Sequence, residues 1–326
     1  MEANNEVWNE RVRAVVPKLD PTKYKGQAGK IGVVGGCQEY TGAPYFAAIS
    51  ALRVGADLAH VFCSRGAGPV IKGYSPELIV HPYLPEDSED TYVPSQEAAV
   101  AAVEKWLSRL DCLVVGPGLG RDPLLLDSVE EIIRRAKRLN LPLVIDADGL
   151  FLVNRNPDLI RDYPLAILTP NVNEYHRLPK ALGVESEFAS AVTEEAKLAL
   201  LSQALGGLTI LKKGGEDLIS NGKTSVCVSG GGSLRRCGGQ GDVLAGSIAV
   251  FMAWAVKAEA EGKLPMDTCE GACFGMVAAY GGCCLLREVA SVTFAEKRRS
   301  MLASDLIPHL GECMESMHPC QLGSQL

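Results

Sequence analysis

The chain has 326 residues, of which 47% are hydrophobic and 22% charged, so it can bury a large core as a compact globular protein. Its formal net charge of −7 and the lack of a dense run of Lys and Arg argue against a nucleic-acid partner. The longest apolar stretch, residues 243–256, is shorter than a bilayer-spanning helix, so it predicts a buried helix and no membrane partner.

The cysteines and the amino terminus predict the cellular compartment. Eleven cysteines are present, an odd number, and several lie in apolar stretches, as Cys112 and Cys283 do. Reduced thiols of an intracellular protein fit this pattern better than disulfides. Residues 1–16 are acidic and polar, without the apolar centre of a secretory signal. These features predict a cytoplasmic protein.

In chain order, short β-branched runs that end near Gly or Asp alternate with stretches of helical periodicity. The runs predict six buried strands, at residues 31–34, 58–62, 113–115, 143–145, 166–168 and 208–211. The helical stretches are residues 43–54, 96–110, 123–139, 174–182 and 193–205. This alternation predicts an α/β fold with a mostly parallel central sheet, right-handed crossovers and helices on both faces.

The pattern changes after residue 211. Asn221 and Gly222 lie in the middle of the run 218–228, where they predict a hairpin with a type I′ turn at the edge of the sheet. A glycine-rich segment, residues 230–241, precedes the apolar helix, and further helices are expected at 271–286 and 304–317. Because there is no internal repeat and no low-complexity linker, residues 1–326 are expected to form a single domain.

The strongest chemical motif is CGGQGD at residues 237–242, directly before the apolar helix. Consecutive glycines let backbone N–H groups converge on an anion, and the positive end of the helix lies at the same place. Asp242 would repel a phosphate there unless it acts as a base or holds Mg²⁺, and a simple helix cap is the alternative. Arg235 and Arg236, just upstream, can bind phosphate oxygens and favour the functional interpretation.

Further clusters follow predicted strands, at the positions where open α/β sheets bind their ligands. Residues 116–120, with the sequence GPGLG, form a loop that either approaches a substrate closely or is a plain turn. Asp146 and Asp148 follow the strand at residues 143–145. They could hold a metal or cap the next helix, and capping is favoured for Asp148.

Asn171 and Glu174 are three residues apart at an expected helix start, so both side chains can reach a hydrated Mg²⁺ at the sheet edge. The same spacing is that of a capping box, and the sequence does not separate the two roles. Lys212 and Lys213 follow the strand at residues 208–211. Either lysine could neutralise a phosphate, although a solvated surface position is favoured for Lys212.

Together these motifs resemble the ribokinase-like superfamily and, within it, the ATP-dependent NAD(P)H-hydrate dehydratases. The resemblance extends over roughly residues 16–309 and includes KGQAGK at 25–30, VVGG at 33–36, YTGAPY at 40–45, GPGLG at 116–120, DADG at 146–149, TPNVNE at 169–174 and CGGQGD at 237–242. It implies a single ribokinase-like catalytic domain that uses ATP and Mg²⁺ on the S form of hydrated NADH or NADPH. In that reaction ATP phosphorylates the hydroxyl of the hydrated nicotinamide ring, and loss of phosphate restores NAD(P)H.

The resemblance also implies roles for individual residues. Asp242 would be the base that takes the proton of the substrate hydroxyl, and Asn171 and Glu174 would lie near Mg²⁺. The hydrated nucleotide would be bound by Gly118, Asn171, Val172, Asn173, Glu174, Tyr175, His176, Arg177 and Asp242, with His176 included only as part of its stretch. ATP would be held by Lys213, Gly214, Gly215, Glu216, Asp217, Gly232, Ser233, Leu234, Arg235, Arg236, Cys237, Gly238, Gly239, Gln240 and Gly241.

Two other functions are alternatives. A small-molecule kinase of the same fold, for a vitamin precursor or a sugar, would stop at the phosphorylated product, and fold alone does not separate the two. The motifs at residues 25–44 favour the dehydratase. A non-catalytic nucleotide-binding protein would have no need of Asp242. The sequence leaves open whether ADP replaces ATP, which hydrated nucleotide is preferred, and whether the chain forms a homo-oligomer.

Overall fold

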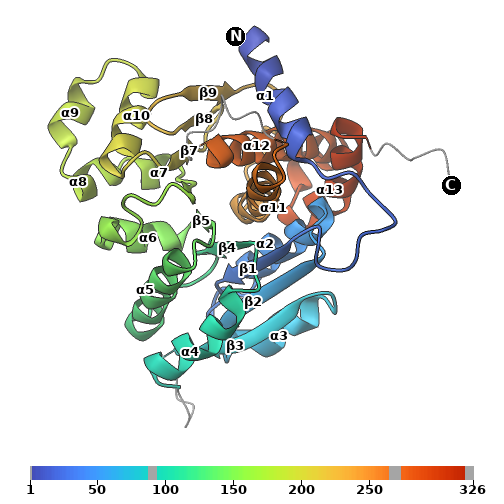
Figure 1. The fold of residues 1–326 in the computed structure, drawn as a ribbon, viewed down its shortest axis with the longest axis vertical. Helices are drawn as coiled ribbons and strands as arrows, with labels where there is room; N and C mark the ends of the chain where they lie inside the picture. Colours follow the sequence, from blue (N-terminus) through green and yellow to red (C-terminus); the bar gives the residue numbers. More distant parts are fainter. Residues whose placement is uncertain (1, 87–93, 264–272, 320–326) are drawn as a thin grey trace.

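A nine-stranded sheet organises the protein in the computed structural model, which describes residues 2–86, 94–263 and 273–319 (Figure 1). The strand order is β3-β2-β1-β4-β5-β6-β7-β8-β9; β1 to β7 are parallel, and β8 and β9 are antiparallel. The strands are β1 Lys30–Val34, β2 Leu58–Ser64, β3 Ile79–Leu84, β4 Cys112–Val115, β5 Leu143–Ile145, β6 Ala166–Leu168, β7 Thr209–Lys212, β8 Asp217–Ser220 and β9 Ser225–Val228. The predicted α/β fold with a mostly parallel sheet is confirmed.

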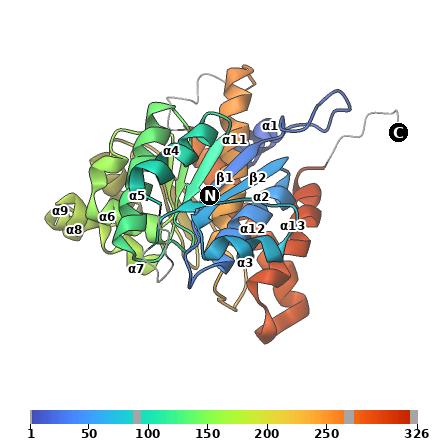
Figure 2. The same ribbon diagram turned by 90° about the horizontal axis from the view of Figure 1, so that it is seen from below.

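Helices cover both faces of the sheet (Figures 1 and 2). One face carries α1 Glu2–Val15, α2 Gly42–Val54, α3 Ala67–Tyr74, α11 Gln240–Ala260, α12 Cys273–Lys297 and α13 Ala303–Met317. The other carries α4 Gln96–Leu107, α5 Pro123–Arg138, α6 Asp148–Arg155, α7 Val172–Tyr175, α8 Leu178–Leu182, α9 Glu185–Ser190 and α10 Glu194–Ala204. Neighbouring strand residues enter opposite cores, Val33 one and Val34 the other, so the strands are apolar throughout.

Strand β3 and helices α1, α3 and α9 are absent from the sequence prediction. β3 contains His81 and Pro82, which interrupt the apolar pattern of a buried strand. Pro82 is tolerated because β3 lies at the edge of the sheet. His81 is buried and its Nε2 lies 3.0 Å from Nδ1 of the buried His60 on β2. The strand was missed because a buried histidine that has a hydrogen-bond partner looks, in the sequence, like a polar residue at the surface.

The helix predicted at residues 174–182 is wrong, because the chain forms two short helices there. α7 ends at Tyr175 and α8 begins at Leu178. Pro179 lies in the first turn of α8, where a missing backbone N–H is tolerated but a continuous helix would be broken.

The hairpin at the sheet edge is confirmed, but its turn is not of type I′. Ser220 pairs with Ser225, so four residues connect the strands β8 and β9. Asn221 does not have the positive φ that a type I′ turn requires. Instead its Oδ1 accepts the backbone N–H groups of Lys223 at 3.1 Å and Thr224 at 2.8 Å. The side chain of Asn221 thus closes the turn together with the backbone, because the N–H of Asn221 donates to the carbonyl oxygen of Thr224 at 3.2 Å.

Helix α11 lies at the centre of one face, packed between α2 and α12. It has 21 residues and is longer than the stretch 243–256 predicted from the sequence. A Cβ at Gly246 would lie 2.0 Å from the carbonyl oxygen of Ala47, so only glycine permits this approach of α2. In the described part of the chain, α11 and residues 274–300 could span a membrane by length and composition alone. The most apolar stretch of 18 residues is 78% buried in α11 and 61% buried in residues 274–300, as expected for helices of a protein core.

Candidate active site

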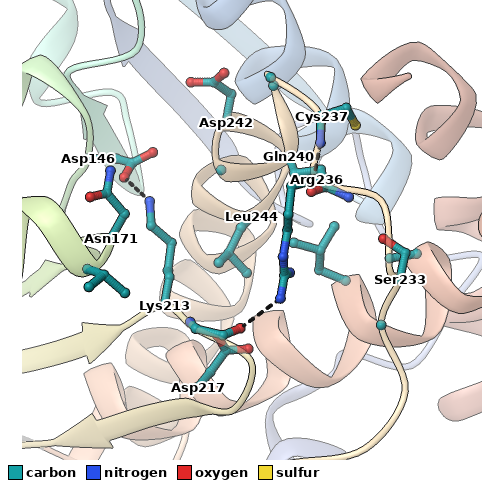
Figure 3. Close-up of a pocket in the computed structure, with 18 of the residues that line it drawn as sticks. Asp146, Asn171, Lys213, Asp217, Ser233, Arg236, Cys237, Gln240, Asp242 and Leu244 are labelled. Carbon is teal, nitrogen blue, oxygen red and sulfur yellow. Dashed lines mark hydrogen bonds and ion pairs between the residues drawn. The ribbon is translucent and has the colours of Figure 1, made fainter. Parts of the chain in front are cut away.

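The carboxyl ends of β5, β6 and β7 converge on the amino-terminal end of α11 and border a cavity of about 710 Å³. Asp146 follows β5, Asn171 follows β6, and Lys213 follows β7. Figure 3 shows these side chains on one side of the cavity, opposite the chain that leads into α11. Three of the four strand-end clusters predicted from the sequence therefore contribute to one site, whereas residues 116–120 do not line it.

The glycine turn before α11 has the backbone geometry that an anion site needs. Gly239 is the N-cap of the helix and has φ of 97°. A Cβ on Gly239 would lie 2.6 Å from Cβ of Ala303, so this position admits only glycine. The first N–H groups of α11 have no acceptor within the helix and carry its positive end. Asp242 lies within this first turn and forms no capping hydrogen bond, so it is not the helix cap.

Lys213 and Asp146 form the charged centre of the site (Figure 3). Lys213 Nζ donates to Asp146 Oδ1 at 2.6 Å, and the same oxygen accepts from Thr169 Oγ1 at 2.8 Å. The side chain of Asp146 is only 2% exposed and that of Lys213 18% exposed. Burial lowers the pKa of Lys213, but the carboxylates of Asp146, Glu174 and Asp242 outweigh it and raise the pKa above its usual value. Lys213 is therefore a fixed cation at this site.

Asp242 has the properties of a proton acceptor near neutral pH. Burial is the largest cause that raises the pKa of Asp242, followed by the negative charge of Asp146, and the pKa reaches about 7. Lys213 opposes the shift, and Asp148 adds to it. A carboxyl group with a pKa near 7 is both available as a base and able to take a proton with useful driving force.

Asn171 and Glu174 form the capping box of α7. Asn171 Oδ1 accepts the backbone N–H groups of Asn173 and Glu174 at 2.9 and 3.0 Å, and Glu174 Oε2 accepts the N–H of Asn171 at 2.8 Å. Both residues also line the cavity. Burial raises the pKa of Glu174, while Lys213 lowers it and Asp146 raises it. The capping role is thus observed, and the role of Asn171 and Glu174 near Mg²⁺ stays a prediction.

Asp148 does not cap α6, contrary to the expectation from the sequence. The N-cap position is Ala147, which makes no side-chain cap and has a strained backbone with φ of 47° and ψ of −120°. Asp148 Oδ2 instead accepts the N–H of Gly120 at 2.9 Å, and Oδ1 pairs with Arg121 at 3.0 Å. Asp148 therefore holds the loop at residues 116–120 against the site.

That loop is packed too closely for side chains. A Cβ on Gly118 would lie 2.7 Å from the carbonyl oxygen of Tyr40, and one on Gly120 would lie 2.9 Å from Sγ of Cys37.

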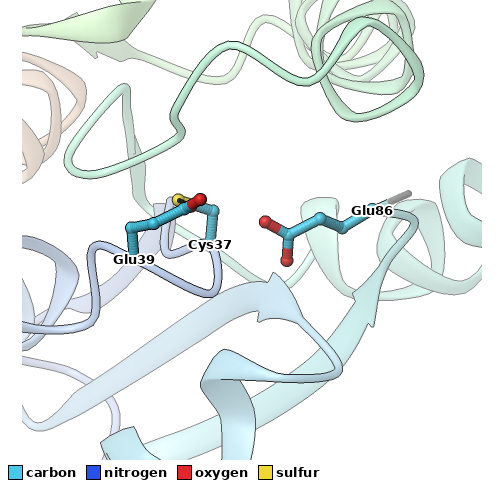
Figure 4. Close-up of side chains that lie close together, drawn as sticks. All are labelled: Cys37, Glu39 and Glu86. Carbon is cyan, nitrogen blue, oxygen red and sulfur yellow. Dashed lines mark hydrogen bonds between the residues drawn. The ribbon is translucent and has the colours of Figure 1, made fainter. Parts of the chain in front are cut away.

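Figure 4 shows Cys37 beside Glu39 and Glu86. The sulfur of Cys37 and a carboxylate oxygen of each glutamate, which are atoms that can bind a metal ion, lie within 4.8 Å of one another.

The hydrogen bonds of this group join residues 37–39 to one another and to Glu86. Cys37 Sγ donates to Glu39 at 3.3 Å, and the carboxylate of Glu86 accepts the backbone N–H of Gln38 at 3.0 Å. Burial raises the pKa of Cys37 to about 11, so the thiol is protonated. Of this group, Cys37 lies against Gly120.

At its other end the cavity is bordered by a loop and by apolar side chains. Asp217 Oδ1 accepts the N–H of Gly214 at 2.9 Å and Asp217 Oδ2 accepts Nε of Arg287 at 2.8 Å. The apolar part of the wall is formed by Leu244, Leu286 and Ala290. Six lining residues were missing from the set inferred from the sequence: Asp146, Ala147, Leu244, Leu286, Arg287 and Ala290. The sequence identified Asp146 only as a carboxylate at the end of a strand. The lining residues on α11 and α12 belong to no sequence motif that could have indicated a binding site.

Most of the residues predicted to bind ATP line this cavity, but several predicted residues do not. The predicted residues outside its lining are Gly118, Tyr175, His176, Arg177, Glu216, Leu234 and Arg235. Tyr175 is fully buried, with its ring against Phe188 and under the ammonium group of Lys212. Its side chain therefore belongs to the core. Leu234 is 92% exposed. Lys212 does not have the solvated position expected for it, because its side chain is only 20% exposed and pairs with Glu194, whose side chain is 44% exposed.

The family model and the curated proteins that this chain resembles carry the same enzyme name, NAD(P)H-hydrate dehydratase. A family model described as NAD(P)H-hydrate dehydratase matches residues 31–310. The ATP-dependent (S)-NAD(P)H-hydrate dehydratase of Arabidopsis thaliana is 53% identical over 327 residues, covering 98% of this chain and 87% of that protein. The human protein of the same name is 50% identical over 309 residues, covering 94% of this chain and 83% of its own.

Solved structures share the fold at low sequence identity. The ADP/ATP-dependent NAD(P)H-hydrate dehydratase of Bacillus subtilis, co-crystallised with ATP/Mg²⁺, has a TM-score of 0.63 and 21% identity, covering 95% of this chain and 97% of that one. A hypothetical protein of Streptococcus mutans has a TM-score of 0.70 and 20% identity, covering 95% and 98%. The ribokinase-like fold predicted from the sequence is confirmed.

Proposed function

Since the chain belongs to the NAD(P)H-hydrate dehydratase family, we propose that the cavity between β5–β7 and α11 is where ATP reacts with the S form of hydrated NADH or NADPH. The chain is a hydro-lyase that uses ATP to restore NAD(P)H. One observation supports this assignment of the site. The glycine turn at residues 238–241, the cation of Lys213 and the carboxylate of Asp242, with a pKa of about 7, line the same cavity.

Asp242 is the base of this reaction. As the substrate hydroxyl attacks the terminal phosphorus of ATP, Asp242 takes the hydroxyl proton and ADP leaves. The C–O bond of the phosphate ester then breaks with push from the ring nitrogen, and phosphate departs with the bonding electron pair. The departing phosphate or water takes a proton from the neighbouring carbon, which forms the ring double bond. The products are NAD(P)H, ADP and phosphate. Phosphorylation is needed because hydroxide is a poor leaving group near neutral pH.

The charge that develops during phosphoryl transfer is met by groups already in place. Residues 238–241 line the cavity and Lys213 is held by Asp146, so neither group needs to reorganise during the reaction. The apolar wall of Leu244, Leu286 and Ala290 suits the adenine ring, and residues 171–174, which line the cavity, suit the hydrated nucleotide.

The residues present fit a Mg²⁺ ion. Glu174 lines the cavity and has one carboxylate oxygen outside the capping box, whereas the side-chain oxygen of Asn171 already accepts two backbone N–H groups. Oxygen ligands of this kind are those that Mg²⁺ prefers, commonly through its bound water. When bound with ATP, the ion would neutralise phosphate charge.

The environment of the protein is also part of the proposal. A cytoplasmic location, with neither nucleic acid nor membrane as a partner, agrees with the net charge of −7 and with the free thiols of the described cysteines.

A test of the function follows the near-ultraviolet absorbance of reduced nicotinamide. The protein is incubated with hydrated NADH and either ATP or ADP, with Mg²⁺. Return of the absorbance band with ATP supports the dehydratase, and a stable phosphoester without return of the band would establish a kinase instead. Return of the band with ADP at the same rate would contradict the preference for ATP.

A further inference from the structure

Arg287, on α12, joins three segments around the wall of the cavity. Its Nε donates to Asp217 at 2.8 Å, and its terminal nitrogens donate to the carbonyl oxygens of Gly215 at 2.8 Å and Gly230 at 3.2 Å. Its own carbonyl oxygen accepts the N–H of Gly232 at 2.9 Å. One residue thereby connects the loop 214–217, the linker 230–232 and α12.

The ion pair at the centre of these contacts is built into the fold. The side chains of Arg287 and Asp217 are 12% and 11% exposed. Asp217 uses its second oxygen for the N–H of Gly214 at 2.9 Å, so both oxygens serve the loop. The planar fork of a guanidinium group can reach a carboxylate and two carbonyl oxygens at once, which a single ammonium group does less well.

The linker depends on Arg287 for its position. Gly230, Gly231 and Gly232 all have positive φ, and glycine loses more conformational freedom on ordering than any other residue. The three atoms nearest to a Cβ added to Gly231 all belong to Arg287, and among the described residues a Cβ added to Gly232 would find only Nη1 of Arg287 within 4 Å. The linker continues into the segment that carries the glycine turn, and both it and the loop 214–217 border the cavity.

We propose that Arg287 is a positioning residue for ATP, which holds the loop 214–217 and the linker 230–232 in the arrangement that binds the nucleotide. This inference rests on the proposed placement of ATP in this cavity. Asp242 and Lys213 are held by other elements, so phosphoryl transfer itself does not depend on Arg287. Loss of Arg287 therefore weakens ATP binding while the chemical step and the binding of the hydrated nucleotide are retained.

The experiment compares steady-state constants of Arg287→Met and Arg287→Lys with those of Arg134→Met. Arg134 is a matched control because it pairs with Glu130 on α5 and lines no part of the cavity. For Arg287→Met the KM for ATP rises about tenfold or more, while kcat changes by less than about threefold and the KM for hydrated NADH is unchanged. Arg287→Lys retains part of the ATP affinity. A KM for ATP equal to that of the wild type in Arg287→Met would overturn the proposal.

A double variant separates positioning from a merely structural role. Arg287→Met leaves the carboxylate of Asp217 buried without its partner and is expected to lower Tm, whereas adding Asp217→Asn removes that charge. We expect the double variant to recover Tm but to keep the high KM for ATP. Recovery of both would show that Arg287 only stabilises the fold. If wild-type protein failed to bind ATP in a direct titration, the proposed function would fail before this comparison.

Discussion

Two aspartates beside glycine-rich backbone have opposite surroundings. Asp57, just before β2, accepts the backbone N–H groups of Gly26 at 2.7 Å and Ala28 at 2.8 Å. Asp242, in the first turn of α11, accepts no hydrogen bond from another side chain of the described residues and lies near the negative charges of Asp146 and Asp148. Asp57 binds the segment at residues 25–30 and Asp242 belongs to the segment at residues 237–242, yet one carboxylate is satisfied within the fold and the other is not.

The difference shows what distinguishes a structural from a reactive carboxylate. A carboxylate that accepts backbone N–H groups helps to order the chain, as Asp57 orders the segment before β1. A partly buried carboxylate beside like charges costs stability, and such perturbed groups are typical of functional sites. Glycine-rich motifs alone do not reveal which kind of carboxylate they accompany.

The largest expected effect is that of Asp242→Asn. This variant keeps the shape of the side chain but cannot accept the hydroxyl proton, so turnover falls by about 10²–10⁴-fold. ATP still binds, because the N–H groups of residues 238–241 are unchanged. Absorbance assays of turnover and calorimetric titration with ATP measure the two effects. Near-normal turnover would remove Asp242 from the role of base.

Removing the fixed cation is expected to affect stability next most strongly. Lys213→Met leaves Asp146, whose side chain is 2% exposed, without its ion partner and lowers the free energy of unfolding by about 3 kcal/mol. Lys212→Met is the control, because its partner Glu194 is 44% exposed and the loss is about 1 kcal/mol or less. Urea unfolding of both variants checks the difference. Equal losses would contradict the contrast between the two lysines.

Asp57→Ala tests the structural side of the comparison. It leaves the N–H groups of Gly26 and Ala28 without their acceptor and lowers the free energy of unfolding by about 1–2 kcal/mol. Because Asp57 lies outside the cavity, kcat is unchanged. A folded variant with a large loss of kcat would show that the segment at residues 25–30 takes part in the reaction.

The fold was predictable wherever the physical signal is local. Strands such as β5 and β6 are buried on both faces and appear as short apolar runs, whereas His81 and Pro82 concealed β3. In the site, the glycine turn was predictable because the glycines that its backbone conformation requires are neighbours in the sequence. Arg287 was not, because it meets Asp217 from 70 residues away on an apolar helix. The capping box at Asn171 was ambiguous because capping and metal binding use the same spacing.

The smallest expected effect is a shift of the pH profile. Because Asp242 must be ionised to act as a base, kcat/KM rises with pH through about 7 and then levels off. Asp148→Asn removes a negative charge that raises the pKa of Asp242, so the midpoint moves to lower pH. An unchanged midpoint would show that Asp148 has no influence on the base.

The same pKa predicts a dependence of stability on pH. The pKa of Asp242 is about 7 in the folded protein, above its ordinary value of 3.8, which describes the unfolded chain. Between these values the folded state binds more protons, so the contribution of Asp242 to stability falls as pH rises. Asp242→Asn lacks this loss and is expected to have a higher Tm than the wild type at pH 8, with the difference vanishing near pH 4. A difference that is independent of pH would contradict the raised pKa.

The most direct test of the account is a crystal structure with an unreactive ATP analogue and Mg²⁺. We expect the terminal phosphoryl group to contact the backbone N–H groups of residues 238–241 and to lie beside the carboxylate of Asp242, with Lys213 on its other side. Phosphates bound elsewhere, with Asp242 far from the terminal phosphorus, would contradict the assignment of this cavity as the place of reaction.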